Sequence, residues 1–350
     1  MEEVVQQFKE TILAAGRQRQ PLCIRGGGSK DWYGQTPQGE ILDTRAYQGV
    51  VAYDPTELVI TVRAGTPLAE VEAVLAQQNQ ALAFEPPHFG AGATVGGMVA
   101  CGMSGPRRAA VGAARDFVLG AVLMNGKGEA LHFGGQVMKN VAGYDVSRML
   151  AGSLGTLGLL LEVSLKVLPK PYAETTLRLE MTEEEAIRRL NVWGGQPLPI
   201  SASAWCDGAL LLRLSGAKAA ITAAQHTIGG EEIAGDDFWL AMREQSNEFF
   251  TQSDVLWRLS LPSIAPPLAL GDQLIEWGGA QRWLRSDADA AAIRAAAVQA
   301  GGHATLFRGG DKSAGVFQPL APAVARIHQN MKNAFDPDGI FNPGRMYPQY

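Results

Sequence analysis

Three glycine-rich segments hold the residues best suited to chemistry in this sequence. The first, Arg25-Gly26-Gly27-Gly28-Ser29-Lys30, directly follows a short apolar run. Consecutive backbone amides with unrestricted φ can converge on one anion, and Arg25 and Lys30 would add positive charge. The alternative is an ordinary glycine turn between a strand and a loop. A Walker A loop is excluded, because Gly120 and Gly126-Lys127 have the wrong spacing and no Ser or Thr follows.

The second and third segments also combine glycines with small polar residues. Residues 87–100 read PHFGAGATVGGMVA, with the spacing G-x-G-x-x-x-G and a proline-rich stretch before it. An NAD-binding βαβ unit is therefore not expected. A small helix that begins after Thr94 would turn its N-terminus toward a phosphate. The third segment, Gly152–Gly158, enters an apolar strand, and Ala151 stands where a GxSxG nucleophile elbow needs its first glycine.

Cysteines and histidines are too few and too scattered for a metal centre. Cys23, Cys101 and Cys206 lie far apart, no CxxC occurs, and the five histidines include no close pair. We therefore expect no metal site and no iron–sulfur cluster in this chain, and reduced thiols as in the cytoplasm.

The composition fits a globular protein of about two domains. The chain has 350 residues, 46% of them apolar, and a net charge of −5. A wholly disordered chain is excluded, and a nucleic acid is not the expected partner because there is no basic excess. No run of 18 apolar residues occurs, and the start MEEVVQQ lacks the basic and apolar regions of a signal peptide. These features predict a cytoplasmic protein that reaches a membrane only through partner subunits.

The elements that must position the three loops form three parts, residues 1–170, 171–318 and 319–350. The first part should hold a helix over about 2–16, a helix from Thr66-Pro67 to about Gln78 with Thr66 as its N-cap, and strands around 117–133 and 158–168. The second part shows two similar sets of strands and helices, which predict two four-stranded antiparallel halves with helices on one face. The last part is a helix with a turn-rich apolar tail that packs back on the first. The predicted fold class is α+β.

The order of the glycine segments resembles the flavoproteins of the vanillyl-alcohol oxidase class, whose FAD-binding domain is of the para-cresol methylhydroxylase (PCMH) type. In that fold the first loop and the TxGG segment hold the pyrophosphate. Residues 139–145 (KNVAGYD) and 335–345 (FDPDGIFNPGR) look like the 2-hydroxy-acid dehydrogenases of this class. With Glu85–His88 and Gly105–Arg108, nearly the whole chain resembles the FAD-binding subunits of bacterial glycolate oxidases. The resemblance implies a PCMH-type FAD-binding domain of two subdomains with a smaller antiparallel-sheet cap domain.

The resemblance also implies the cofactor and the residues that hold it. Some relatives attach FAD covalently through a histidine in the first loop, and Ser29 lies near that place, so we expect non-covalent FAD. The expected FAD-binding residues are Arg25, Gly26, Gly27, Gly28, Ser29, Lys30, Pro87, Ala93, Thr94, Gly96, Gly97, Gly102, Ser104, Gly152, Gly155, Gly158, Leu159, Asn342 and Arg345. Alanine at Gly27 is expected to weaken FAD binding by pressing a Cβ against the phosphates.

The activity implied by the resemblance is the oxidation of glycolate to glyoxylate, in a complex with a larger FAD subunit and an iron–sulfur subunit. Leu154 and Leu161 replace the acid and the threonine of the GSEGTLGIITE segment of catalytic relatives, and their HxGDGNxH-like stretch is absent. A non-catalytic subunit that holds FAD for structure or electron relay is therefore the alternative. A relative of the UDP-sugar reductases that shares only the FAD fold is a third, weaker possibility.

Oxidation of a 2-hydroxy acid needs a cation for the carboxylate and a base for the hydroxyl proton. Arg282 and Arg308 are the candidates for the cation. His88 is a candidate for a flavin-side residue or the base, and His303 is a candidate catalytic residue that would face the active-site cavity. The ordinary alternatives are arginines in ion pairs or at the surface and a histidine that caps a turn.

Overall fold

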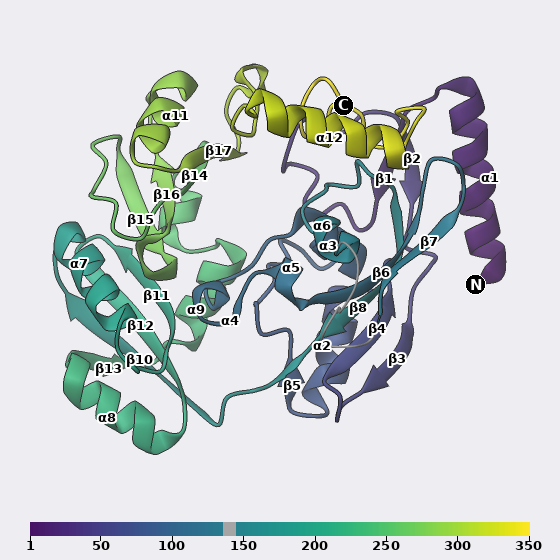
Figure 1. Cartoon of the computed structure of the whole chain (residues 1–350). Helices are drawn as coiled ribbons and strands as arrows, with labels where there is room; N and C mark the ends of the chain where they lie inside the picture. The colour runs from purple at the N-terminus through teal and green to yellow at the C-terminus, as the bar shows by residue number, and fades with distance from the viewer. Residues whose placement is uncertain (136–144) are drawn as a thin grey trace. The chain divides into compact units, whose positions relative to one another are not determined.

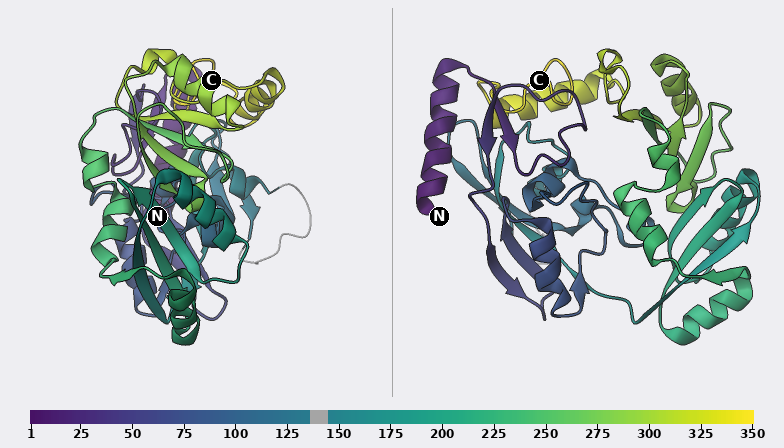
Figure 2. Two further views of the ribbon diagram at one scale, coloured as in Figure 1. Left: turned by 90° about the vertical axis from the view of Figure 1, so that its left-hand side faces the viewer. Right: turned by 180° about the vertical axis from the view of Figure 1, so that it is seen from behind.

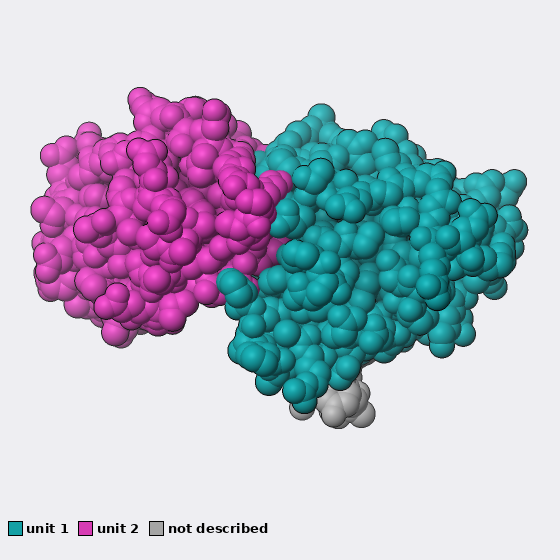
Figure 3. All heavy atoms as spheres, turned by 90° about the horizontal axis from the view of Figure 1, so that it is seen from above, with its two compact units in different colours: residues 1–103, 113–169, 319–350 teal, residues 104–112, 170–318 magenta. Residues whose placement is uncertain are grey.

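The computed structural model describes residues 1–135 and 145–350. These residues form two compact units, coloured separately in Figure 3. Unit 1 comprises Met1–Met103, Ala113–Pro169 and Pro319–Tyr350, and unit 2 comprises Ser104–Gly112 and Lys170–Gln318. The C-terminal segment thus belongs with the N-terminal half of the chain. Residues 139–144 of the KNVAGYD motif lie outside the described residues.

Unit 1 is built on an antiparallel five-stranded sheet. In spatial order its strands are β3 (Val50–Asp54), β4 (Val59–Arg63), β8 (Leu159–Lys166), β6 (Val118–Met124) and β7 (Ala130–Gly134). The central strand β8 is buried along most of its length, as its predominantly apolar sequence predicts. The expected pairing of the segments around 117–133 is confirmed, since β6 and β7 run antiparallel across the turn at Gly126-Lys127-Gly128.

A second small sheet carries the first glycine loop. Its strands β1 (Leu22–Arg25) and β2 (Glu40–Asp43) are parallel, and Leu22 also forms a bridge with Phe341 of the C-terminal tail. Helix α1 (Glu2–Gln18) lies at the edge of unit 1 in Figures 1 and 2. Its buried face packs into one core with residues of the strands and of the C-terminal tail. That core contains Phe8, Ile12, Ala15, Leu22, Leu42, Tyr47, Met124, Leu159, Leu161, Ile340 and Phe341. The tail is therefore part of the core beneath the first loop.

The helix expected at Thr66-Pro67 forms, but its start differs from the prediction. Helix α2 spans Leu68–Ala76 with Pro67 at the N-cap, and no side chain caps it. The Thr66 hydroxyl instead donates to the Arg63 carbonyl at 2.7 Å and accepts from the Gly49 amide at 2.8 Å. Thr66 is fully buried, so its hydroxyl ties the ends of β3 and β4 together rather than capping the helix.

Unit 2 contains one eight-stranded sheet where the sequence predicted two four-stranded halves. Its order is β13 (Glu231–Ile233), β10 (Ala173–Glu180), β12 (Ala209–Gly216), β11 (Ile200–Cys206), β15 (Asp272–Glu276), β16 (Gln281–Arg285), β14 (Leu256–Ser260) and β17 (His303–Arg308). The halves join because Ala204 and Trp205 of β11 pair with Glu276 and Ile275 of β15. All the pairings are antiparallel.

Each half of this sheet nevertheless keeps its own core. The first packs β10 and β12 against α7 (Glu183–Gly194) and α8 (Lys218–Ile228), while the second packs β14, β16 and β17 against α11 (Ala290–Gln299). The predicted repetition of strand and helix sets is visible in these two clusters. The α+β class is confirmed, with helices and antiparallel sheets in both units.

Candidate cofactor-binding site

Two adjoining hollows in unit 1 bring the three glycine segments together with the C-terminal tail. The first is lined by the first loop, by the helix that follows Thr94 and by the tail residues Asn342 and Arg345. The second is lined by apolar and small residues, including Ala64, Gly155 and Leu160. The residues that line both are Ile24, Gly26, Gly97, Ala100, Leu154 and Asn342. The two hollows therefore form one continuous site with a polar, cationic end and an apolar end. The cationic end suits the charged part of a ligand, and the apolar end suits a flat ring.

The glycines of the first loop are required by close backbone approaches. A Cβ on Gly27 would lie 1.5 Å from the Gly92 carbonyl oxygen, and one on Gly26 would lie 2.3 Å from Thr94 Oγ1. Gly28 has a φ of 74°, which side-chain-bearing residues rarely adopt. The first and second loops are thus packed backbone to backbone. The predicted effect of alanine at Gly27 acquires a different cause, because the added Cβ points at the second loop.

Three cationic side chains surround the polar end of the site. The Arg25 guanidinium lies 2.7 Å from the Asp31 carboxylate, while its buried Nε has no hydrogen-bond partner among the described residues. The Lys30 ammonium is almost fully buried and donates to the His88 carbonyl at 3.0 Å and to Ser29 Oγ at 3.3 Å. A buried unpaired donor beside a buried ammonium needs an acceptor, and phosphate oxygens would supply it.

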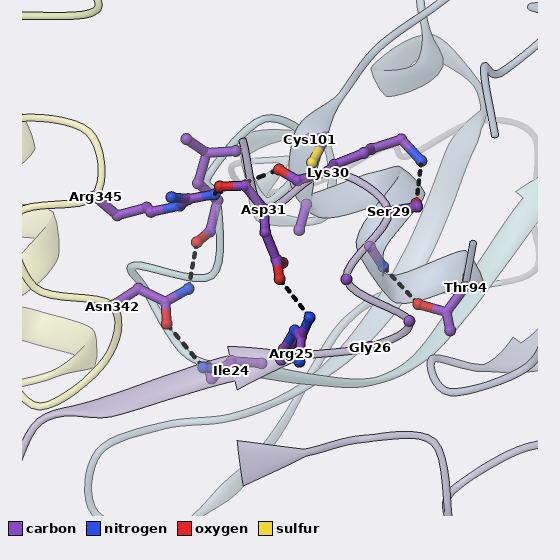
Figure 4. A pocket seen from close by; sticks show the side chains of 15 residues that line it. Ile24, Arg25, Gly26, Ser29, Lys30, Asp31, Thr94, Cys101, Asn342 and Arg345 are labelled. Carbon is purple, nitrogen blue, oxygen red and sulfur yellow. Dashed lines mark hydrogen bonds and ion pairs between the residues drawn. The ribbon is translucent and has the colours of Figure 1, made fainter. Parts of the chain in front are cut away.

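Arg345, the third cation, holds the first loop from the tail side (Figure 4). Its guanidinium donates to the carbonyls of Asp31 at 2.9 Å, of Lys30 at 3.4 Å and of Gln35. Burial lowers the pKa of Arg345, partly offset by the nearby Cys101, Asp31 and Cys23 side chains. These contacts hold the first loop by a residue that lies more than 300 positions later in the sequence.

The second loop leads into a short helix packed against the sheet. Helix α3 (Val95–Cys101) begins after Thr94, whose Oγ1 accepts from the Gly97 amide at 3.2 Å. A Cβ on Gly96 would lie 2.7 Å from the Ala64 Cβ, so only glycine allows α3 to approach β4 this closely. The start of this helix after Thr94 agrees with the prediction, and the N-cap hydrogen bond of Thr94 adds to it.

The third loop meets the tail at one side chain. Asn342 Nδ2 donates to the Leu154 carbonyl at 2.6 Å, and Asn342 Oδ1 accepts from the Ile24 amide at 2.8 Å (Figure 4). Leu154 and Asn342 have positive φ values of 51° and 41°, so both backbones are held in a less favourable conformation. One amide group therefore joins β1, the third loop and the tail at the centre of the site.

Most of the predicted FAD-binding residues line the hollows, and five do not. Those that line them are Arg25, Gly26, Gly27, Gly28, Ser29, Lys30, Thr94, Gly96, Gly97, Gly155, Gly158, Leu159, Asn342 and Arg345. Pro87, Ala93, Gly102, Ser104 and Gly152 are absent from both linings. Gly102 ends α3 and packs on Gly152, and Ser104 belongs to unit 2, which explains why these three do not line the site.

None of the four predicted catalytic residues lines either hollow. Arg282 is fully buried, and its guanidinium donates to the carbonyls of Ala265, Pro266 and Gly279. The structure thus gives Arg282 a role in holding the chain around 262–279. Burial, opposed by the Glu183 charge, lowers its pKa.

The other three candidates have side chains that are engaged by, or perturbed by, groups outside the two linings. Arg308 donates to the Phe250 carbonyl, and burial lowers its pKa. His303 begins β17, where burial and the Arg258 charge lower its pKa. His88 Nε2 lies 3.1 Å from a Glu72 carboxylate oxygen, so the contribution of His88 to the site is its carbonyl, which accepts from Lys30.

Several lining residues were not among those predicted, and most of them are small or aliphatic types that carry no chemical signal. They are Ile24, Asp31, Thr44, Ala64, Ala100, Cys101, Leu154 and Leu160. Asp31 and Cys101 are the members of this set with ionisable side chains. Burial raises the pKa of the Cys101 thiol to about 11. A thiol with that pKa is a poor nucleophile near neutral pH.

The described residues contain no group of three or more metal-ligating side chains and no helix long and apolar enough to cross a bilayer.

Comparison with known proteins agrees with this geometry. The model of an FAD binding domain family matches residues 3–134. The chain is 51% identical to the glycolate oxidase subunit GlcE of Escherichia coli K12 over 345 residues, covering 98% of this chain and 97% of the relative. It is 29% identical to the glycolate oxidase subunit GlcD of Bacillus subtilis, covering 49% of this chain and 37% of the relative. It is 32% identical to a D-lactate dehydrogenase of Archaeoglobus fulgidus, covering 48% and 38%.

Among solved structures, an alkyldihydroxyacetonephosphate synthase matches with a TM-score of 0.66 at 15% identity, covering 96% of this chain and 74% of that one. This similarity supports the fold alone. The cofactor of the chain is FAD. The residues present fit it, because the polar end offers the orphaned Arg25 Nε and the Lys30 ammonium, and the apolar end is lined by small and aliphatic side chains.

Proposed function

The chain belongs to the family of the glycolate oxidase subunit GlcE, and we propose that it is the FAD-binding subunit of a complex that oxidises glycolate to glyoxylate. The observation that carries the proposal is the identity of 51% along nearly the whole of both chains. Bound FAD would supply a two-electron acceptor that takes the hydrogen of the substrate carbon as a hydride, while the hydroxyl proton would leave to a base, so that the hydroxyl becomes a carbonyl. The protein's part is to hold and orient FAD with the first loop, the second loop and the tail.

The complex we propose has a larger FAD subunit and an iron–sulfur subunit beside this chain. The likeness to GlcD, named a glycolate oxidase subunit, supports the first partner. The need for an electron acceptor supports the second, since three cysteines cannot hold a four-thiolate cluster. The three free thiols fit a reducing compartment, so we place the chain in the cytoplasm, with any membrane contact made by partners.

We propose that FAD is bound without a covalent link. No histidine lines the site within the described residues, and the Cys101 thiol, with a pKa of about 11, is a weak nucleophile. Acid precipitation of the purified chain tests this directly. FAD is expected in the supernatant, and yellow colour retained in the pellet would contradict the proposal.

A second candidate function is an FAD-holding structural or electron-relay subunit whose partner oxidises the substrate. It is favoured by the contacts of Arg282 and Arg308, whose guanidinium groups donate to backbone carbonyls of unit 2. A cation engaged in this way is not free to hold a substrate carboxylate. Oxidation of glycolate by this chain alone would require another cation to hold the substrate carboxylate.

Anaerobic addition of glycolate to the purified flavin-loaded chain separates the two functions. Bleaching of the flavin absorbance would establish oxidation by this chain, with D-lactate as a second 2-hydroxy acid. An oxidised flavin that bleaches only after the partner subunits are added would establish the relay function. Bleaching by NADPH but by neither hydroxy acid would contradict both and favour a reductase.

A further inference from the structure

Helix α12 (Pro322–Phe335) contains a buried ion pair that does not line the FAD site. Lys332 is the one buried residue of this helix, and its ammonium lies 2.7 Å from the carboxylate of Asp336 at the helix end. The two side chains are 5% and 0% exposed. A buried ion pair seldom adds much stability by itself, so its hydrogen-bond partners indicate what it does.

All three donors of the Lys332 ammonium have acceptors. Besides Asp336, it donates to the Thr156 carbonyl at 2.8 Å and to the Phe341 carbonyl at 2.7 Å. Thr156 belongs to the third loop, between Gly155 and Gly158, which both line the site. Phe341 immediately precedes Asn342. One buried charge therefore links the third loop to the tail.

Asp336 completes the arrangement from the opposite side. Its carboxylate accepts from the Ile340 amide at 3.1 Å and from the Phe341 amide at 2.8 Å. The turn of residues 336–341 is thus held by Asp336 at the amides of Ile340 and Phe341 and by Lys332 at the Phe341 carbonyl. The next residue, Asn342, contacts Ile24 and Leu154 inside the site.

We propose that Lys332, through its pair with Asp336, is a positioning residue of the FAD site that sets the third loop and Asn342 at their places in the lining. This inference rests on the FAD-binding role of the chain and is independent of the substrate. Loss of the ammonium would free the Thr156 and Phe341 carbonyls and leave the Asp336 carboxylate buried without its cation. The third loop and the tail, which Lys332 joins, would then move apart, although Lys332 itself does not line the site.

The test is the Kd of FAD for the apoprotein, measured by quenching of flavin fluorescence. Lys332→Met is expected to raise this Kd about tenfold or more, since hydrogen bonds to a charged group are lost at the lining. Lys127→Met is the matched control, because Lys127 is exposed on the turn between β6 and β7. Leu75→Ala controls for general destabilisation, because Leu75 is buried on α2 and lines neither hollow. It should lower the Tm and leave the Kd unchanged.

Hydrogen exchange on the unmodified protein gives a second measurement that does not depend on how a variant folds. FAD is expected to slow exchange of the Ile340 and Phe341 amides, which do not line the site but are tied to it through Asp336. Folded Lys332→Met with a Kd within twofold of the parent, or no change in the exchange of these amides, would overturn the proposal. Failure of the parent chain to bind FAD at all would instead overturn the cofactor assignment, and this inference with it.

Discussion

Replacement of Gly27 by alanine tests the packing of the first loop against the second. The added Cβ would lie 1.5 Å from the Gly92 oxygen, 2.3 Å from its carbonyl carbon and 2.8 Å from its Cα. Since Cβ contacts below 3.0 Å are essentially never seen, the two backbones must separate by at least 3.0 − 1.5 = 1.5 Å. No rotamer change can relieve the clash, because every clashing atom is main chain.

The cost falls mainly on the FAD-bound state. A first loop displaced by that distance no longer keeps its amides, Arg25 and Lys30 in the places where they line the site, so it fits FAD less well. Overpacking of this kind costs about 1–3 kcal/mol, which corresponds to a rise in the FAD Kd of roughly 5- to 150-fold. Titration of the apoprotein with FAD measures the effect. The control is Gly194→Ala at the end of α7, where a Cβ meets nothing within 4 Å and the Kd should stay unchanged. Parental FAD affinity in folded Gly27→Ala would refute the assignment of this loop.

Three further perturbations follow from the site and from unit 2. Arg282→Met should lower the Tm, because the carbonyls of Ala265, Pro266 and Gly279 lose their donor and a buried group left unsatisfied costs about 1–3 kcal/mol. An unchanged Tm with a raised KM for glycolate would restore the predicted carboxylate-binding role of Arg282. Asn342→Ala should raise the FAD Kd by roughly tenfold, since it removes the contacts to Ile24 and Leu154, and a Kd equal to that of the parent would contradict the central place of this amide. Burial raises the pKa of Cys101 to about 11 from 9.0, so its alkylation at pH 8 should be about 100-fold slower than that of an ordinary thiol. The alkylation rate should rise with pH until the pH reaches this pKa. Fast labelling of Cys101 at pH 8, located by mass spectrometry, would contradict the raised pKa.

The parts of the site that sequence predicted are those whose residue types are costly elsewhere in a fold. A dense run of glycines needs a local reason such as a close backbone approach, so the first loop and Gly96 were predicted from the sequence, and they line the two hollows. Ile24 and Ala100 line the same site, yet aliphatic residues are equally common in any core, so nothing in the sequence marks them. Their place is fixed by the chain segments that meet there.

The same limit explains the arginines and the helix start. An arginine that binds a substrate and one that holds backbone carbonyls have the same sequence signature, and only the neighbours of Arg282 distinguish them. Thr66-Pro67 fits a helix N-cap locally, but the close approach of β3 and β4 offers the Thr66 hydroxyl better partners. Likewise Lys332 looks like any helical lysine until the fold brings Thr156 and Phe341 to it. In each case at least one partner, Gly49, Ala265 or Thr156, lies well apart in the sequence, where no local pattern reveals it.

The distribution of charged groups bears on whether this chain oxidises the substrate itself. Cationic groups that line the described site lie at Arg25, Lys30 and Arg345, which is the end suited to phosphates. The apolar end is lined by small and aliphatic side chains and Asn342, without a charged group. A carboxylate bound there would lack the cation that its desolvation requires, and an unpaired buried carboxylate is costly. A glycolate site therefore needs a cation from beyond this lining, supplied either from elsewhere in this chain or by another subunit. Flavin bleaching by glycolate in the isolated chain would require the first source, whereas bleaching only in the complex would require the second.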